Sequence, residues 1–191
     1  MDIDVIFDET IFLLEKVRDK YKEKIIEVSE KIYECFKKGN KLLICGNGGS
    51  ASDAQHMSAE FVNRFKIERK PLPAIALTTD TSIITSIGND YSFNEIFSKQ
   101  VIALGKEGDI LLGISTSGKS KNVVNALKVA KEMGLITIGL SGDYAEDMGK
   151  TCDYYIYVPS KNTPRIQEAH LLIEHTICEL IDQFWRRDNH P

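Results

Sequence analysis

Two segments far apart in the chain each carry a pair of side chains, at helical spacing, that suit acid/base or metal chemistry. His56 and Glu60 are four residues apart, and Gln167 and His175 are eight apart. The first pair follows a glycine-rich segment, Cys45–Ser50 (CGNGGS), which is typical of a turn from a strand into a helix. A turn of this kind beside a carboxylate and an imidazole indicates acid/base chemistry on a small phosphorylated molecule.

Each of the two pairs also has an ordinary interpretation. His56 and Glu60 share one helical face, where such a pair is usually a surface salt bridge. Gln167 and His175, taken alone, are typical of core or surface positions. If the two helices met, two imidazoles, a carboxylate and an amide oxygen would form a four-ligand set for a divalent metal, with zinc favoured. Sequence spacing leaves that convergence open.

A second polar segment, Ser115–Ser120 (STSGKS), follows an apolar run and precedes a helical pattern. Its hydroxyls and free backbone N–H groups would lie at the positive end of a helix dipole, which suits a phosphate. Helix capping would explain one serine, but this segment has three serines and a threonine in six residues. Extended back to Gly113, it also matches the nucleotide P-loop pattern, so ATP or GTP is an alternative. Against that alternative, no other predicted strand runs directly into an aspartate that would hold magnesium.

The elements that must position these segments follow from the spacing of apolar residues. Apolar positions recurring every three to four residues predict an N-terminal helical arm over residues 1–39. They are Ile11, Leu14, Val17, Tyr21, Ile25, Val28, Ile32 and Phe36. Short β-rich runs then alternate with helical ones and predict strands over 42–45, 74–77, 110–114, 136–140 and 154–158. This alternation predicts an α/β fold: a five-stranded parallel sheet flanked by helices, with ligands bound beyond the carboxyl ends of the strands.

Composition and charge indicate the number of domains and argue against nucleic-acid binding. A chain of 191 residues with 42% hydrophobic content can bury one core, so we predict a single domain, residues 1–191, with an arm (1–39) and an α/β core (40–191). A net charge of −4 gives no general reason to bind nucleic acid, and we interpret the basic run Lys66–Lys70 as a solvated loop. His170 and His190 lack comparable context, and we interpret them as structural or solvent-facing.

Cysteine usage indicates the compartment. The four cysteines lie far apart with no Cys-x-x-Cys, and the sequence shows neither a signal peptide nor an apolar run long enough to span a bilayer. We therefore expect a cytoplasmic protein with reduced thiols and no membrane contact.

Four segments, in order, resemble the phosphoheptose isomerases of the sugar isomerase (SIS) superfamily. They are Cys45–His56, Ile87–Asp90, Ser115–Ser120 and Arg165–His175. The resemblance covers nearly the whole chain, including the arm, and outweighs the isolated P-loop match. It implies a single SIS domain that converts D-sedoheptulose 7-phosphate to D-glycero-D-manno-heptose 7-phosphate. That reaction is the first step toward nucleotide-activated heptoses for lipopolysaccharide, capsule or other surface glycans.

The resemblance also implies roles for individual residues. It implies one zinc ion per subunit, held by His56, Glu60, Gln167 and His175. The substrate contacts that it implies are Asn47, Gly48, Gly49, Ser50, Glu60, Asn89, Asp90, Ser115, Thr116, Ser117, Ser120 and Gln167. It further implies a homotetramer with active sites between subunits, which agrees with an amphipathic arm that needs burial.

The implied chemistry suits these residue types. Interconverting a ketose and an aldose moves a proton between adjacent carbons through an enediol, so it needs a base and an acid but no redox cofactor. Glu60 is the candidate base for the carbon-bound proton and His175 the candidate acid. A zinc ion nearby would polarise the carbonyl. Because a metal ligand is less free to transfer protons, the division of roles between Glu60 and His175 stays open.

Two other functions compete with this one. The DnaA-initiator-associating protein, a non-catalytic binding module of replication control, resembles the same family in fold and length but lacks the catalytic glutamate and the final histidine. This chain has both Glu60 and His175, which favours the enzyme. Another SIS enzyme, acting on a hexosamine or pentose phosphate, would usually bring extra domains for which 191 residues leave no room.

Overall fold

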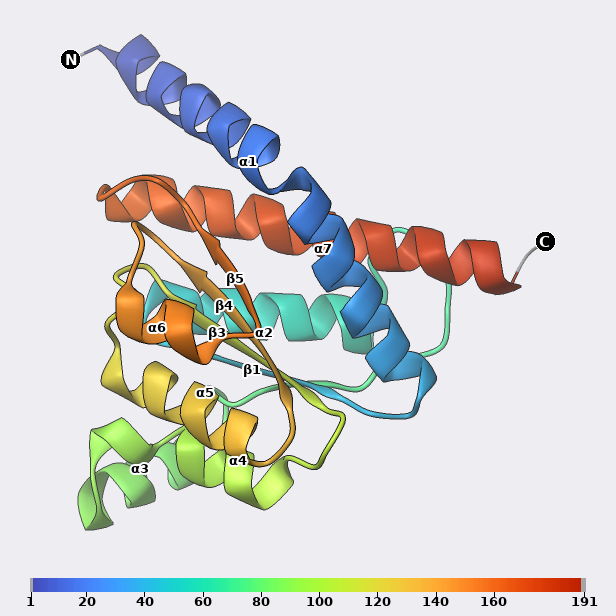
Figure 1. The fold of residues 1–191 in the computed structure, drawn as a ribbon, viewed down its shortest axis with the longest axis vertical. Coiled ribbons are helices and arrows are strands. Elements are labelled where there is room, and N and C mark those ends of the chain that lie inside the picture. Colours follow the sequence, from blue (N-terminus) through green and yellow to red (C-terminus); the bar gives the residue numbers. More distant parts are fainter. Residues whose placement is uncertain (1, 190–191) are drawn as a thin grey trace.

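The computed structural model describes residues 2–189 and contains a five-stranded parallel sheet in the order β2-β1-β3-β4-β5 (Figure 1). The strands are β1 (Leu42–Gly46), β2 (Ala74–Ala76), β3 (Ile110–Ser115), β4 (Ile136–Ser141) and β5 (Tyr154–Tyr157). The sequence-based prediction of an α/β fold with a five-stranded parallel sheet is confirmed, and each strand differs from its predicted range by one residue at its carboxyl end.

Helices cover both faces of this sheet (Figure 1). They are α1 (Ile3–Lys37), α2 (Gly49–Val62), α3 (Thr81–Asp90), α4 (Ser98–Leu104), α5 (Lys121–Glu132), α6 (Glu146–Thr151) and α7 (Thr163–Asn189), with a 3-10 turn at Phe93–Glu95. In β1, Leu42 and Ile44 pack with α1, α2 and α7, whereas Leu43 and Cys45 pack with α4, α5 and α6. Successive side chains of a strand point to opposite faces, so a strand covered on both sides is apolar throughout.

The predicted helical arm is α1, which ends just before Gly39, a glycine with φ of +75°. Its later turns are buried against the same chain: Val17 is 4% exposed, Ile25 7% and Ile32 0%. Its first turns reach the start of α7, where Ile6 and Thr10 bond with Arg165 and Glu168, and leave large apolar side chains exposed. These are Ile3, Val5, Ile6, Phe7, Ile11 and Phe12. The buried apolar residues of α1 therefore belong to this chain's own core. The apolar side chains of its first turns are exposed instead.

The interpretation of Lys66–Lys70 as a solvated loop is wrong for one residue. The Arg69 side chain is 0% exposed and forms an ion pair of 2.9 Å with Asp182 on α7. Sequence composition did not reveal this burial, because the groups that surround Arg69 come from other elements. Within residues 2–189, no helix is long and apolar enough to cross a membrane.

Candidate active site

The strand order places a binding crevice between β1 and β3. In a doubly wound sheet of order 2-1-3-4-5, successive strands are added on opposite sides of this parallel pair, so the strand order reverses there, and ligands bind beyond the carboxyl ends of the two strands. At that edge, β1 ends at Gly46 and β3 ends at Ser115. The glycine-rich turn and the hydroxyl-rich loop both start there, so the two polar segments found in the sequence lie at one edge of the sheet.

The glycine-rich turn leads directly into α2. Gly48 has φ of +56°, a left-handed conformation that favours glycine. A Cβ atom added at Gly49 would collide with Nε2 of Gln167 from α7. The turn therefore needs glycine for two reasons, and the second brings the Gln167 amide directly against the start of α2.

The hydroxyl-rich loop brings its serines together. Ser115 Oγ lies 2.9 Å from Ser120 Oγ and 3.5 Å from Ser117 Oγ. The loop turns at Gly118, with φ of +62°, and α5 begins at Lys121. Three hydroxyl groups therefore lie together before the N-terminus of a helix, an arrangement that suits a phosphate. Gly113 lies inside β3, paired with Cys45 and Gly139, so it is not part of a nucleotide-binding loop.

A reciprocal amide pair joins the two segments. Asn47 donates to Asn122 Oδ1 at 2.9 Å, and Asn122 donates back to Asn47 Oδ1 at 2.8 Å. Asn122 is 2% exposed and lies in the first turn of α5. Our sequence reasoning missed Asn122; the available signal was a polar amide immediately after the serine-rich loop. The pair links the glycine-rich turn to the first turn of α5, directly after the hydroxyl-rich loop.

Two helices bring the acid/base candidates together. His56 Nε2 on α2 lies 2.8 Å from His175 Nε2 on α7, and it lies 3.6 Å from Glu60 Oε1. The ring of Phe65 stacks on His175 with centroids 5.5 Å apart. The two helices do meet, with His56 between Glu60 and His175. Gln167 lies toward the other end of the contact between α2 and α7, beside Gly49.

These donors suit zinc in their chemistry and their direction. Two imidazole nitrogens point at one another with a carboxylate nearby, and zinc prefers nitrogen and carboxylate oxygen ligands. Tetrahedral zinc with bonds of about 2.0–2.1 Å would hold two nitrogens roughly 3.3 Å apart, so the rings would have to separate by about half an ångström. Within residues 2–189, no group of three or more His, Cys, Asp and Glu side chains is already arranged to hold a metal.

Asn89 and Asp90 do not join this cluster within one chain. They lie at the end of α3, are exposed, and bond to each other at 2.8 Å. In the range Thr81–Asp90 no residue is buried, and the helix lies on the α4–α5 side of the sheet, away from α7 (Figure 1). Within one chain, Asn89 and Asp90 therefore lie apart from the His56–Glu60–His175 cluster.

Two further ionisable groups on α7 are buried. Glu174 is 0% exposed, and both of its carboxylate oxygens lack a hydrogen-bond partner among the described residues. Burial, reinforced by the nearby Asp53 carboxylate, raises the pKa of Glu174 well above its usual range. His170 is also buried, with Nε2 2.9 Å from the Ser141 carbonyl oxygen, and burial lowers its pKa to about 4. His170 is therefore structural, while His190 lies outside the described residues.

Comparisons with known proteins identify the family of this chain. A family model described as "SIS domain" matches residues 7–142. A phosphoheptose isomerase of Aliarcobacter butzleri is 56% identical over 167 residues, covering 87% of this chain and 88% of the relative. Phosphoheptose isomerase 1 of Campylobacter jejuni is 59% identical over 162 residues, covering 85% and 87%. A solved phosphoheptose isomerase from Neisseria gonorrhoeae is 42% identical, with a TM-score of 0.90 and coverage of 95% and 97%.

The sheet, the switch-point loops and the matched family model together place this chain among the SIS domain proteins. Within that class, the identity over most of both chains shows that it belongs to the phosphoheptose isomerase family, whose members are enzymes.

Proposed function

We propose that this chain converts D-sedoheptulose 7-phosphate to D-glycero-D-manno-heptose 7-phosphate, the first step of nucleotide-activated heptose synthesis for lipopolysaccharide, capsule or other surface glycans. The observation that carries this proposal is the contact of His56 with both Glu60 and His175, in a chain that also gathers three serine hydroxyls before α5. The names of the relatives support the same reaction. A purely binding role would not require a carboxylate and two imidazoles in contact.

In this mechanism the phosphate binds to the hydroxyls of Ser115, Ser117 and Ser120 and to the N-terminal end of α5. That contact places the carbonyl end of the open-chain sugar toward α2 and α7. Glu60 removes the proton from the carbon next to the carbonyl and returns it to the neighbouring carbon. His175 donates a proton to the carbonyl oxygen and accepts one from the adjacent hydroxyl. Positioned groups of this kind each contribute roughly 10²–10⁴-fold in rate.

We assign a zinc site to His56, Glu60, Gln167 and His175; the Gln167 amide, which lies against Gly49, would have to turn toward the two imidazoles to join it. The direction of the two imidazoles and the adjacent carboxylate support this assignment. When bound, zinc would polarise the sugar carbonyl as a Lewis acid. Residues that hold the metal share their lone pairs with it, so a ligand of the zinc would be less free to transfer protons.

The enzyme that we propose is a cytoplasmic homotetramer with active sites between subunits, and it binds neither nucleic acid nor membranes. Support comes from the exposed apolar turns at the start of α1 and from an apolar groove of about 550 Å³ between α1 and α7. Asn89 and Asp90 are exposed and separate from the cluster, so a neighbouring subunit would have to supply them as substrate contacts. All four cysteines, Cys35, Cys45, Cys152 and Cys178, are free thiols, as expected in a reducing compartment.

The test is an NMR assay of sedoheptulose 7-phosphate with the parent protein, Glu60→Gln and His175→Gln. Each variant should keep the oligomer and lose at least about a hundredfold in turnover, the lower end of what a positioned acid or base supplies. Both should also bind zinc less tightly. Near-parental turnover in folded Glu60→Gln would refute the mechanism. An inactive parent that binds a protein partner tightly would instead favour the non-catalytic binding module.

A further inference from the structure

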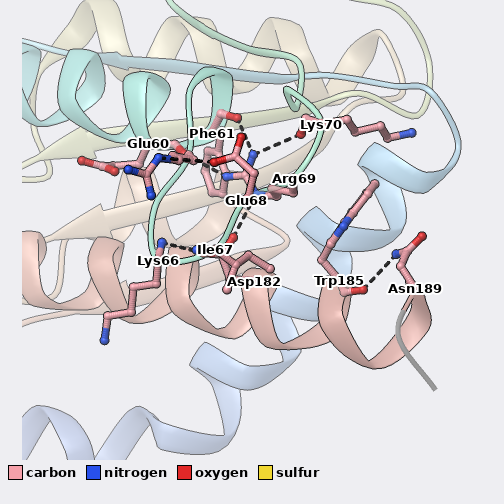
Figure 2. A network of polar contacts seen from close by, with 11 residues as sticks. Glu60, Phe61, Lys66, Ile67, Glu68, Arg69, Lys70, Asp182, Trp185 and Asn189 are labelled. Atoms are coloured by element: carbon pink, nitrogen blue, oxygen red, sulfur yellow. Dashed lines mark hydrogen bonds and ion pairs between the residues drawn. The ribbon is translucent and has the colours of Figure 1, made fainter.

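Arg69 is a buried cation beside the helix that carries Glu60. It lies in the segment between α2 and β2, and its side chain is 0% exposed (Figure 2). Nη2 donates to the Glu60 carbonyl oxygen at 2.8 Å, and Nη1 donates to the carbonyl oxygens of Phe61 at 2.8 Å and Lys70 at 3.3 Å. Nε donates to Asp182 Oδ1 at 2.9 Å. One guanidinium therefore connects three segments of the chain.

Two of these acceptors are the carbonyls of the last turn of α2. That helix ends at Val62, and the final carbonyls of a helix have no partner within the helix. A cation at this end also interacts favourably with the helix dipole. Arg69 thus caps α2 at the residue that carries the candidate base, because it holds the backbone of Glu60 itself.

Asp182 ties the same guanidinium to α7. Its side chain is 3% exposed, and Oδ2 accepts hydrogen bonds from the backbone N–H groups of Lys66 at 2.8 Å and Ile67 at 3.2 Å. Asp182 lies about two turns beyond His175 on the same helix. The chain of contacts therefore runs from the helix of His175, through Asp182 and Arg69, to the backbone of Glu60 (Figure 2).

We propose that Arg69 is a positioning residue, which fixes Glu60 on α2 relative to His175 on α7. The proposal rests on the proposed roles of Glu60 and His175. Buried charge-assisted hydrogen bonds have narrow geometry, and a guanidinium fork bonds several acceptors at fixed angles, which an ammonium group cannot do. A displacement of about 1 Å at a reacting group can cost roughly a hundredfold in rate.

Arg69 should affect turnover more than substrate binding, because it contacts the part of α2 that carries Glu60 and not the loop assigned to the phosphate. Arg69 holds only the C-terminal end of the helix, where Glu60 lies. The substrate phosphate is assigned to the Ser115–Ser120 loop, at the opposite edge of the site, with which Arg69 makes none of its bonds within residues 2–189. Loosening the cap should therefore lower kcat and leave KM nearly unchanged.

The experiment compares Arg69→Lys and Asp182→Asn with a matched control. The control is Lys66→Gln with Glu179→Gln, which removes an exposed ion pair of 2.7 Å between the same loop and α7. We expect each of the first two variants to lose about tenfold or more in kcat with KM within twofold of the parent. The control variants should keep parental kcat and KM. Thermal unfolding of every variant shows which are folded at the assay temperature.

Asp182→Asn keeps the shape of the side chain, so it tests the inference even if Arg69→Lys does not fold. Parental kcat in folded Asp182→Asn or Arg69→Lys would overturn the proposal, as would a loss confined to KM or an equal loss in the control. Glu60→Gln, assayed in parallel, distinguishes failure of the role proposed for Arg69 from failure of the proposed catalytic mechanism. If Glu60→Gln is inactive while Asp182→Asn is fully active, only the role of Arg69 fails; if Glu60→Gln is fully active, the proposed mechanism fails first.

Discussion

Ser117 and Ser120 present hydroxyl groups next to Ser115 at the start of α5. Each can donate one hydrogen bond to a phosphate oxygen, and a bond to a charged acceptor contributes roughly 1.5–3 kcal/mol. We expect Ser117→Ala and Ser120→Ala each to weaken binding of the sugar phosphate by about tenfold to a hundredfold. Calorimetric titration of an inactive Glu60→Gln background measures this directly.

The unphosphorylated heptulose is the control ligand for these two serines. Its weaker binding should be the same in the parent and in both variants, because only the phosphate contact is removed. An unchanged affinity for the phosphorylated sugar would show that the phosphate binds elsewhere.

At the scale of elements, α7 supplies residues to the candidate active site and also packs against the sheet. Gln167 and His175 contact α2 at Gly49 and His56, whereas His170 is fully buried against the end of β4. The His170 ring bonds to the end of β4 through the Ser141 carbonyl, 2.9 Å from Nε2. The neutral imidazole therefore helps to hold α7 on the sheet, at the strand edge where the site lies.

This burial predicts a pH dependence of stability. Burial lowers the pKa of His170 from 6.5 to about 4, so the unfolded chain binds a proton more readily than the folded chain between these values. Stability from the neutral ring is complete above pH 6.5 and is lost as the pH falls toward 4. By linkage the loss is roughly 3 kcal/mol. Urea unfolding of the parent and His170→Gln, at fixed protein concentration, measures it.

The difference in the free energy of unfolding between the parent and His170→Gln reports on His170 alone, because the other titrating groups are the same in both proteins. The free energy of unfolding of the parent should fall toward, or below, that of His170→Gln as the pH is lowered from 7 to 4.5. A constant difference across this range would show that the ring is not held neutral.

At the scale of the whole molecule, the first turns of α1 are the apolar surface that assembly would cover. Phe7 is 61% exposed and Phe12 59% exposed, whereas Val17 and Ile25 already lie in the core of the same chain. We expect Phe7→Asp with Phe12→Asp to split the oligomer and leave each chain folded. Charged residues at Val17 or Ile25 should instead unfold the chain, because they would bury an unpaired charge.

Light scattering, with circular dichroism as the measure of folding, distinguishes these outcomes. Glu30→Lys, on an exposed face of the same helix, is the charge-change control and should keep the parental mass. A parent protein with the mass of one 21.5 kDa chain would contradict the assembly and the shared active sites.

Much of the fold follows from local patterns in the sequence. The apolar runs of buried parallel strands are distinctive, so each strand was located to within one residue at its end. The glycine-rich turn and the serine-rich loop were also visible, because the left-handed conformations of Gly48 and Gly118 and the hydroxyls before α5 are properties of short segments. These patterns, with the family resemblance, select the candidate site residues.

Only the tertiary structure decided which distant groups meet. His56 and His175 are separated by 119 residues, and their contact depends on how α2 and α7 pack on one face of the sheet. Arg69 was interpreted as solvated because its neighbours in sequence are charged, yet carbonyls of α2 and the Asp182 carboxylate enclose it. Spacing along one helix determines which side chains share a face. The distance between side chains on different elements depends on packing, which no local pattern contains.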